Sequence, residues 1–190
     1  MKITDVKTFL VGNIPPYHGG RFWLFIKLIT DEGLEGLGEW STGNIGREQS
    51  QIRVIEDLAH NFVIGEDPFR IEWLWQRMYA THHDFRHPGM TSTAAMSAIE
   101  MACWDIVGKA LKQPIYNLLG GAFHDKLRGY AYMPFNAAKQ SAEDAGRIAT
   151  EMRDQGYTAF KFDPFTPLFP SPRDFSLKTI NRVANICQKI

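Results

Sequence analysis

Cysteine is scarce in this sequence. Its 190 residues include two, Cys103 and Cys187, and both occupy apolar positions of expected helices. We therefore expect two buried thiols rather than a disulfide framework. Free thiols favour a reducing compartment, so the cytoplasm is the expected location.

An excess of charge of one sign is also absent, because 21 Lys and Arg residues balance 21 Asp and Glu residues. This balance gives no electrostatic reason to expect nucleic acid or an anionic membrane surface as a partner. Long apolar runs are missing too, since none approaches the roughly 20 residues that cross a bilayer. The first residues lack the apolar core of a secretory signal, so we expect a strand there.

The first forty residues carry the pattern of β structure. Val6, Thr8 and Leu10 alternate with polar neighbours, as in a half-buried strand. Residues 22–29 are apolar on both faces apart from Lys27, which suits a central strand. A tight turn at Gly33 and a third strand over residues 34–40 complete an antiparallel meander.

Helical periodicity takes over after residue 46. Apolar stripes predict helices over residues 52–62 and 93–111, and Asp67-Pro68 predicts the start of another helix between them. Pro114 ends the last of these. A strand meander followed by helices predicts an α+β domain.

The pattern changes after Gly121. Residues 128–134 and 157–162 read as strands, and each precedes a helix. Ser141 caps the first of these helices, and the second has an apolar stripe at Leu177, Ile180, Val183, Ala184 and Cys187. A helix that crosses over between two strands makes them parallel. We therefore predict domains over residues 1–125 and 126–190, the second being the first two βα units of an incomplete (β/α) TIM-like barrel.

The segment from Ala98 to Lys109, AIEMACWDIVGK, continues through Pro114 to a Leu118-Leu119-Gly120-Gly121 end. It resembles the signature of the mandelate racemase/muconate lactonizing enzyme group of the enolase superfamily. Lys112 departs from the resemblance, because the family commonly has Gly there, and its presence implies loss of the usual left-handed helix cap. We interpret Trp104 and Asp105 as a packing residue and its polar neighbour rather than catalytic groups.

The resemblance implies a capping domain over a barrel that holds the active site at the C-terminal ends of its strands. It also implies abstraction of a proton α to a carboxylate, an enediolate stabilised by Mg²⁺, and homo-oligomers. The family's acidic metal ligands lie on the third to fifth barrel strands, whereas this chain ends at Ile190. We therefore expect no metal ligand here and no activity from this polypeptide alone.

Lys161 and Asp163 end the second predicted barrel strand, where barrel enzymes place catalytic groups. Strand alternation directs both side chains to one face, inward if Phe162 faces the helices. The resembled family often has Lys-x-Lys here with the second lysine as a base, so Asp163 argues against a lysine base. The pattern is more similar to the acid-sugar dehydratases, in which Lys161 would hold a carboxylate or enediolate oxygen and Asp163 would bind hydroxyls or orient Lys161. A buried ion pair is the structural alternative.

Substrate contacts are expected from loops of the capping domain. The resemblance assigns this role to the loop that contains Tyr17, His18 and Arg21, and the Arg21 guanidinium suits a carboxylate. Thr42 and His82 are further candidates on other loops. Solvated surface loops would explain the same composition, and the histidine spacing after His82 fits no standard zinc pattern.

Three functions remain open at this point. The first is the N-terminal portion of a Mg²⁺-dependent dehydratase that acts on an acid-sugar substrate. The second is a racemase, epimerase or cycloisomerase of the same group. The third is a non-catalytic binding or assembly module.

Overall fold

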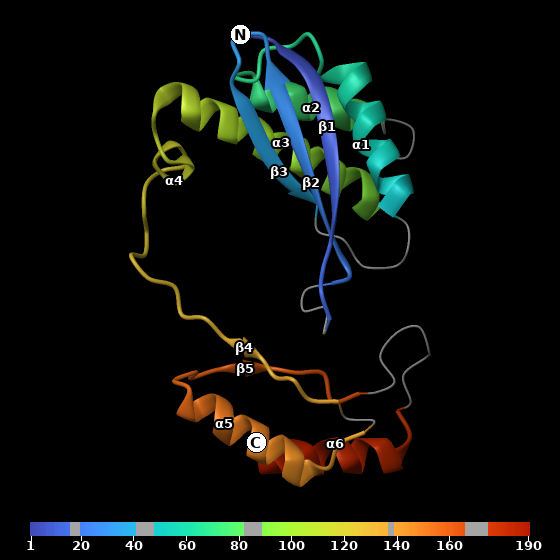
Figure 1. The fold of residues 1–190 in the computed structure, drawn as a ribbon. Coiled ribbons are helices and arrows are strands. Elements are labelled where there is room, and N and C mark those ends of the chain that lie inside the picture. Colours follow the sequence, from blue (N-terminus) through green and yellow to red (C-terminus); the bar gives the residue numbers. More distant parts are fainter. Residues whose placement is uncertain (16–19, 41–47, 82–88, 137–138, 166–174) are drawn as a thin grey trace. The chain divides into compact units, whose positions relative to one another are not determined.

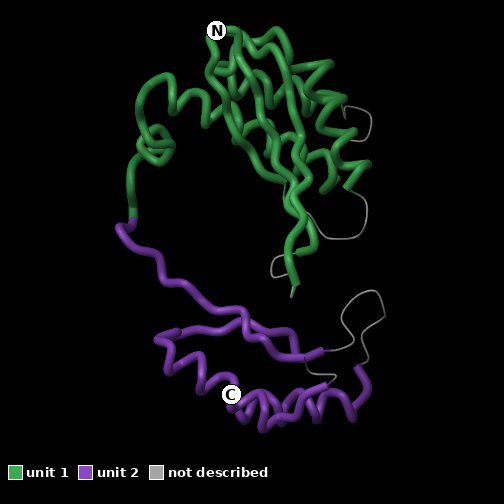
Figure 2. The backbone as a smooth tube through the Cα atoms, in the orientation of Figure 1, with its two compact units in different colours: residues 1–123 green, residues 124–190 purple. Residues whose placement is uncertain are grey.

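The computed structural model describes residues 1–15, 20–40, 48–81, 89–136, 139–165 and 175–190. Figure 1 gives the order of the helices and strands. The chain divides into two compact units, residues 1–123 and 124–190, which Figure 2 colours separately. Each unit is described by itself.

The first unit begins with an antiparallel sheet of three strands, β1 (Ile3–Gly12), β2 (Phe22–Thr30) and β3 (Glu35–Trp40). The strand order is β1-β2-β3, so the meander and the central position of β2 are confirmed. Gly33 has a φ of 81° in the turn between β2 and β3, the conformation expected from its lack of a side chain.

Four helices follow: α1 (Glu48–Phe62), α2 (Ile71–Ala80), α3 (Gly89–Leu111) and the short α4 (Ile115–Leu118). Figure 1 shows the first three on one side of the sheet. Alternate residues of β2 pack against them, with Leu24, Ile26 and Leu28 fully buried. The predicted α+β architecture is therefore confirmed.

The predicted start of the second helix at Asp67-Pro68 is wrong, because α2 begins at Ile71. The Asp67 carboxylate accepts the Phe69 N–H at 3.0 Å, and the Asp67 carbonyl accepts the Arg70 N–H at 3.0 Å. These bonds fold the Asp-Pro sequence into a turn that precedes the helix.

The expected loss of the left-handed cap after α3 is also wrong. Lys112 itself has a φ of 54°, and the next residue, Gln113, donates its N–H to the Gly108 carbonyl at 2.9 Å. The cap is formed, although a side chain in this conformation carries an energetic cost that glycine would avoid.

The second unit contains β4 (Ala131–Tyr132), α5 (Ala142–Asp154), β5 (Phe160–Lys161) and α6 (Leu177–Lys189). β4 and β5 are parallel, as predicted, but both strands are shorter than the sequence pattern suggested. Each strand has one hydrogen-bonded neighbour in this two-stranded sheet, an arrangement that is marginal by itself.

The start of α5 is fixed by a capping box. The Ser141 hydroxyl accepts the Asp144 N–H at 3.1 Å, and the Asp144 carboxylate accepts the Ser141 N–H at 3.0 Å. This confirms the cap predicted at Ser141. Met133, which directly follows β4, packs with Ala145, Ile148 and other apolar residues of α5 and α6.

The buried face of the last helix differs from the apolar stripe that the sequence predicts. The buried residues of α6 are Thr179, Val183 and Ile186, whereas Leu177 and Ile180 are exposed. Cys187 is exposed too, so the expectation of a buried thiol is wrong there and confirmed at Cys103, and both cysteines are free. Within the described ranges, no helix is long and apolar enough to cross a bilayer.

Candidate functional site

The candidate site lies at the C-terminal end of β5, on the face of the sheet opposite the helices. Phe160 and Phe162 pack against the apolar cluster formed by α5 and α6. Because side chains alternate along a strand, Lys161 points to the other face, where it is exposed. Figure 1 shows both helices on one side of the β4-β5 pair.

The rings of two tyrosines on the neighbouring chain segment lie beside the Lys161 ammonium. Its nitrogen lies 5.8 Å from the ring centroid of Tyr132 and 5.9 Å from that of Tyr130. Tyr132 is also the residue paired with Lys161 in the parallel ladder. The sequence-based predictions do not include these tyrosines, although the alternation Tyr130-Ala131-Tyr132-Met133 places both on one face.

Asp163 follows Lys161 by two residues and is half-buried. One of its carboxylate oxygens accepts the backbone N–H of Phe165 at 3.0 Å. A carboxylate that bonds to the backbone two residues later stabilises a turn, here the one that leads the chain away from the strand. Asp163 therefore has a structural contact, and Lys161 is the better placed of the two to meet a ligand.

Arg21 belongs to the first unit and lies immediately before β2, where it is exposed. Its carbonyl accepts the Asn13 N–H at 2.8 Å, and the Asn13 side chain donates to the Gly20 carbonyl at 2.7 Å. These bonds close the base of the predicted substrate loop. The other four candidates, Tyr17, His18, Thr42 and His82, lie outside the described residues.

The residues around Lys161 do not fit a magnesium ion. Across the described parts of the chain, no three His, Cys, Asp or Glu side chains lie together so that they could hold a metal. Magnesium needs near-octahedral oxygen ligands, whereas the chain after β5 offers the Asp163 carboxylate beside a lysine ammonium that would repel the ion. No chemical step at this site is therefore assigned to a metal.

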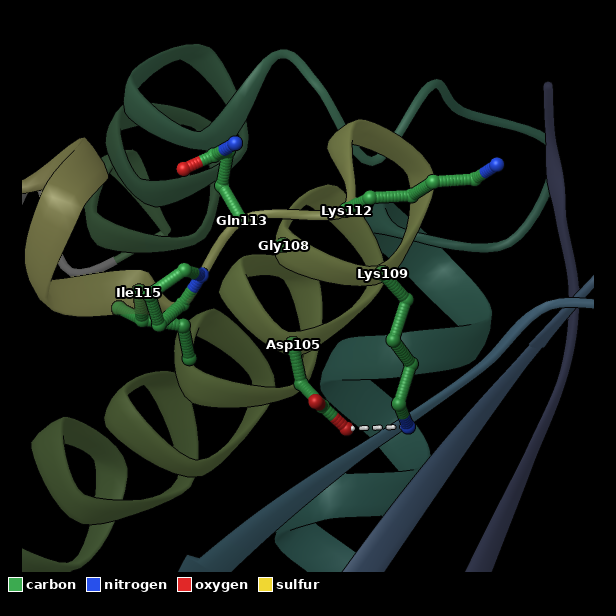
Figure 3. A pocket seen from close by; sticks show the side chains of 7 residues that line it. Asp105, Gly108, Lys109, Lys112, Gln113 and Ile115 are labelled. Atoms are coloured by element: carbon green, nitrogen blue, oxygen red, sulfur yellow. Dashed lines mark hydrogen bonds and ion pairs between the residues drawn. The ribbon is translucent and has the colours of Figure 1, made fainter.

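The signature helix α3 makes polar contacts with the edge strand β3. The Asp105 carboxylate accepts the Leu37 N–H at 2.8 Å and the Lys109 ammonium at 2.7 Å. Lys109 also donates to the Glu35 carbonyl at 2.7 Å. Figure 3 shows the Asp105–Lys109 pair at the side of a pocket of about 380 Å³. This pair therefore satisfies backbone groups on the free edge of the sheet.

Small residues bring the same helix close to the same strand. A Cβ atom added at Gly38 would lie 1.9 Å from the Ala98 carbonyl oxygen, and one at Gly36 would lie 2.0 Å from that of Ala102. The partly buried Trp104 donates its indole N–H to Glu100 at 3.3 Å. These contacts agree with a structural role for the signature.

Comparison with known proteins gives the family. The model of the mandelate racemase / muconate lactonizing enzyme N-terminal domain matches residues 19–120. The chain therefore belongs to this family, within the enolase superfamily, as the signature indicated.

Two curated relatives are named D-galactonate dehydratase. The protein from Xanthomonas campestris pv. campestris (strain B100) is 38% identical over 165 residues, which cover 87% of this chain and 37% of the relative. The protein from Klebsiella pneumoniae (strain 342) is 36% identical over 166 residues, which cover 86% of this chain and 38% of the relative. The chain thus spans less than half the length of these relatives.

Solved structures of the family have the same fold. The mandelate racemase/muconate lactonizing enzyme from Jannaschia sp. CCS1 is 36% identical with a TM-score of 0.87, and the match covers all of this chain and 50% of that structure. The one from Sulfitobacter sp. is 34% identical with a TM-score of 0.88, and the match covers all of this chain and 49% of that structure.

Proposed function

We propose that this chain is the N-terminal part of an acid-sugar dehydratase. The enzyme removes the proton α to the substrate carboxylate and expels the β-hydroxyl as water, which leaves a 2-keto-3-deoxy acid. The observation that carries the proposal is the exposed Lys161 ammonium at the end of β5, in a chain whose relatives are named D-galactonate dehydratase. We take D-galactonate and related sugar acids as the first substrates to test.

Lys161 supplies positive charge to the reacting carboxylate. Removal of the α-proton moves negative charge onto the carboxylate oxygens, and a cation already placed there lowers the free energy of the transition state. The ammonium has three N–H donors for those oxygens. Asp163 binds substrate hydroxyls or orients Lys161, and its position in place of a second lysine disfavours a lysine base on this strand.

Residues 1–125 act as the capping domain in this proposal, and residues 126–190 begin the barrel. Arg21 binds a carboxylate of the substrate, and further substrate contacts come from Tyr17, His18, Thr42 and His82. We further propose a homo-oligomer located in the cytoplasm, and light scattering on the purified full-length gene product tests the oligomer.

Family membership suggests a metal cofactor, and we propose Mg²⁺ for the whole enzyme. The described residues form no site for it, so we expect residues 1–190 alone to be inactive. Titration calorimetry on that polypeptide should show no tight stoichiometric Mg²⁺ binding. Tight binding together with dehydration activity would overturn this expectation.

The central experiment incubates the full-length gene product with Mg²⁺ and a panel of sugar acids, beginning with D-galactonate. Formation of a 2-keto-3-deoxy acid is the expected result, and chelation of the metal should abolish it. Lys161→Ala should remove activity, whereas Lys178→Ala, which alters an exposed lysine on α6, should not.

Two other outcomes would replace the proposal. Exchange of the α-proton with deuterated solvent, without loss of water, would identify a racemase or epimerase of the same family. Absence of both exchange and dehydration across the panel would favour a non-catalytic binding or assembly module.

A further inference from the structure

The face of the β4-β5 sheet that carries Lys161 also carries two aromatic side chains that lie outside the apolar cluster of this unit. Tyr130 and Tyr132 are 59% and 55% exposed, whereas the next residue, Met133, points to the opposite face and is 1% exposed. The helices thus take the Met133 side of the segment as their core. The tyrosine side carries the Lys161 ammonium.

We propose that Tyr130 and Tyr132 are positioning residues, which hold the Lys161 ammonium with their ring faces so that it meets the substrate carboxylate. The inference rests on the dehydratase function proposed above and adds two residues to its site. Both ring centroids lie within 6 Å of the Lys161 nitrogen, the range in which an aromatic face attracts a cation.

The strand geometry explains why the three side chains meet. Tyr132 and Lys161 are paired across the parallel ladder, which is held by the Met133 N–H donating to the Lys161 carbonyl at 2.8 Å. Tyr130 lies two residues before Tyr132 and therefore on the same face. The rings thus approach the ammonium from the neighbouring chain segment, and Lys161 remains exposed.

This arrangement favours binding of an anion at Lys161. A lysine side chain has many rotamers, and ordering it on ligand binding costs conformational entropy. Ring faces that attract the ammonium restrict it before the substrate arrives, so less entropy is lost when the carboxylate binds. Aromatic ring faces attract a positive charge. They therefore support a role for Lys161 in electrostatic stabilisation of the substrate rather than as a base.

Substitutions that keep or remove the ring faces test the role in binding. In the full-length gene product, Tyr130→Leu and Tyr132→Leu should each raise KM about 2- to 5-fold with a much smaller effect on kcat, and the double variant should raise it further. Tyr130→Phe and Tyr132→Phe should leave KM unchanged because the rings remain. Tyr157→Leu, at an exposed tyrosine of the same unit, is the control.

A spectroscopic readout tests the contact without any activity. Lysines methylated reductively with ¹³C-formaldehyde and a borohydride reagent keep their charge, and the Lys161→Arg variant identifies the Lys161 signal in proton–carbon NMR spectra. We expect a signal shifted upfield by the rings in the natural protein and both Phe variants, and loss of this shift in the double Leu variant.

The two measurements separate the possible failures. A ring-shifted Lys161 signal in a protein that dehydrates no sugar acid would leave the contact standing and reject the proposed function. A Lys161 signal that is the same in the double Leu variant would overturn the inference. Unchanged KM in that variant, or equal KM increases in the Phe and Leu variants, would overturn it as well.

Discussion

Gly38 offers the most direct test of how the capping domain is assembled. A Cβ atom at this position would lie 1.9 Å from the Ala98 carbonyl oxygen, whereas ordinary contact begins at 3.4 Å. Gly38→Ala would therefore force β3 and α3 apart by about 1.5 Å, and no side-chain rotation can relieve a clash with backbone. Overpacking of this kind costs about 1–3 kcal/mol. The removal of a flexible glycine from a strand returns about 0.5–1 kcal/mol, so we expect a net loss of roughly 1 kcal/mol.

Urea unfolding followed by circular dichroism measures this loss, with Gly12→Ala as the matched control. Gly12 also lies in a strand, but a Cβ atom added there meets nothing within 4 Å. The control has the same gain without the clash, so it should raise the unfolding free energy by about 0.5–1 kcal/mol. Equal unfolding midpoints for the two variants would refute the close approach of β3 to α3.

Three further predictions concern the same scaffold. Asp105→Ala should cost about 0.5–1.5 kcal/mol because it removes the acceptor of the exposed Leu37 N–H and the partner of Lys109. Lys109→Ala leaves the bond between Asp105 and Leu37 in place and should cost less, and a larger loss for Lys109→Ala than for Asp105→Ala in urea unfolding would contradict the edge contact. Lys112→Gly should raise the unfolding free energy by about 0.5–1 kcal/mol because it relieves the left-handed conformation, and an unchanged or lower midpoint would argue against that strain. Burial raises the pKa of the Cys103 thiol to about 12, so a thiol reagent at pH 8 should modify Cys187 rapidly and Cys103 only after unfolding. The same pKa shift stabilises the fold below the ordinary thiol pKa, and this contribution should be lost between pH 9 and 12 as the folded-state pKa is approached.

Much of the fold could be predicted because its apolar residues follow regular periods. The alternation in β1 and the mostly apolar β2 predicted the meander and its central strand, and the stripe around Ile99 predicted α3. The start of α2 could not be read in the same way, because Asp67 and Pro68 favour a turn as well as a helix start. The burial of α6 depends on which neighbours surround it, and the sequence pattern of Leu177 and Ile180 carries no information on that.

The candidate site was predictable only in part. Lys161 and Asp163 could be found because barrel enzymes place reactive groups at strand ends. Tyr130 and Tyr132 were not found, because their relation to Lys161 depends on the register of two parallel strands separated by a helix. Local sequence patterns do not determine that register, since the paired residues are 29 positions apart. The turn made by Asp163 likewise depends on the backbone of Phe165, which composition alone does not reveal.

The signature and the candidate site illustrate different constraints on the chain. Ala98, Ala102, Asp105 and Lys109 are spaced so that they follow one side of α3, and each meets backbone atoms of β3. The hydrogen bonds of Asp105 and Lys109 reach backbone groups and do not depend on which side chains β3 carries, whereas the close approach at Ala98 and Ala102 requires glycine at positions 38 and 36. The signature thus identifies the family through its scaffold. The chemistry must then be argued from groups such as Lys161, whose side chains are exposed to a ligand.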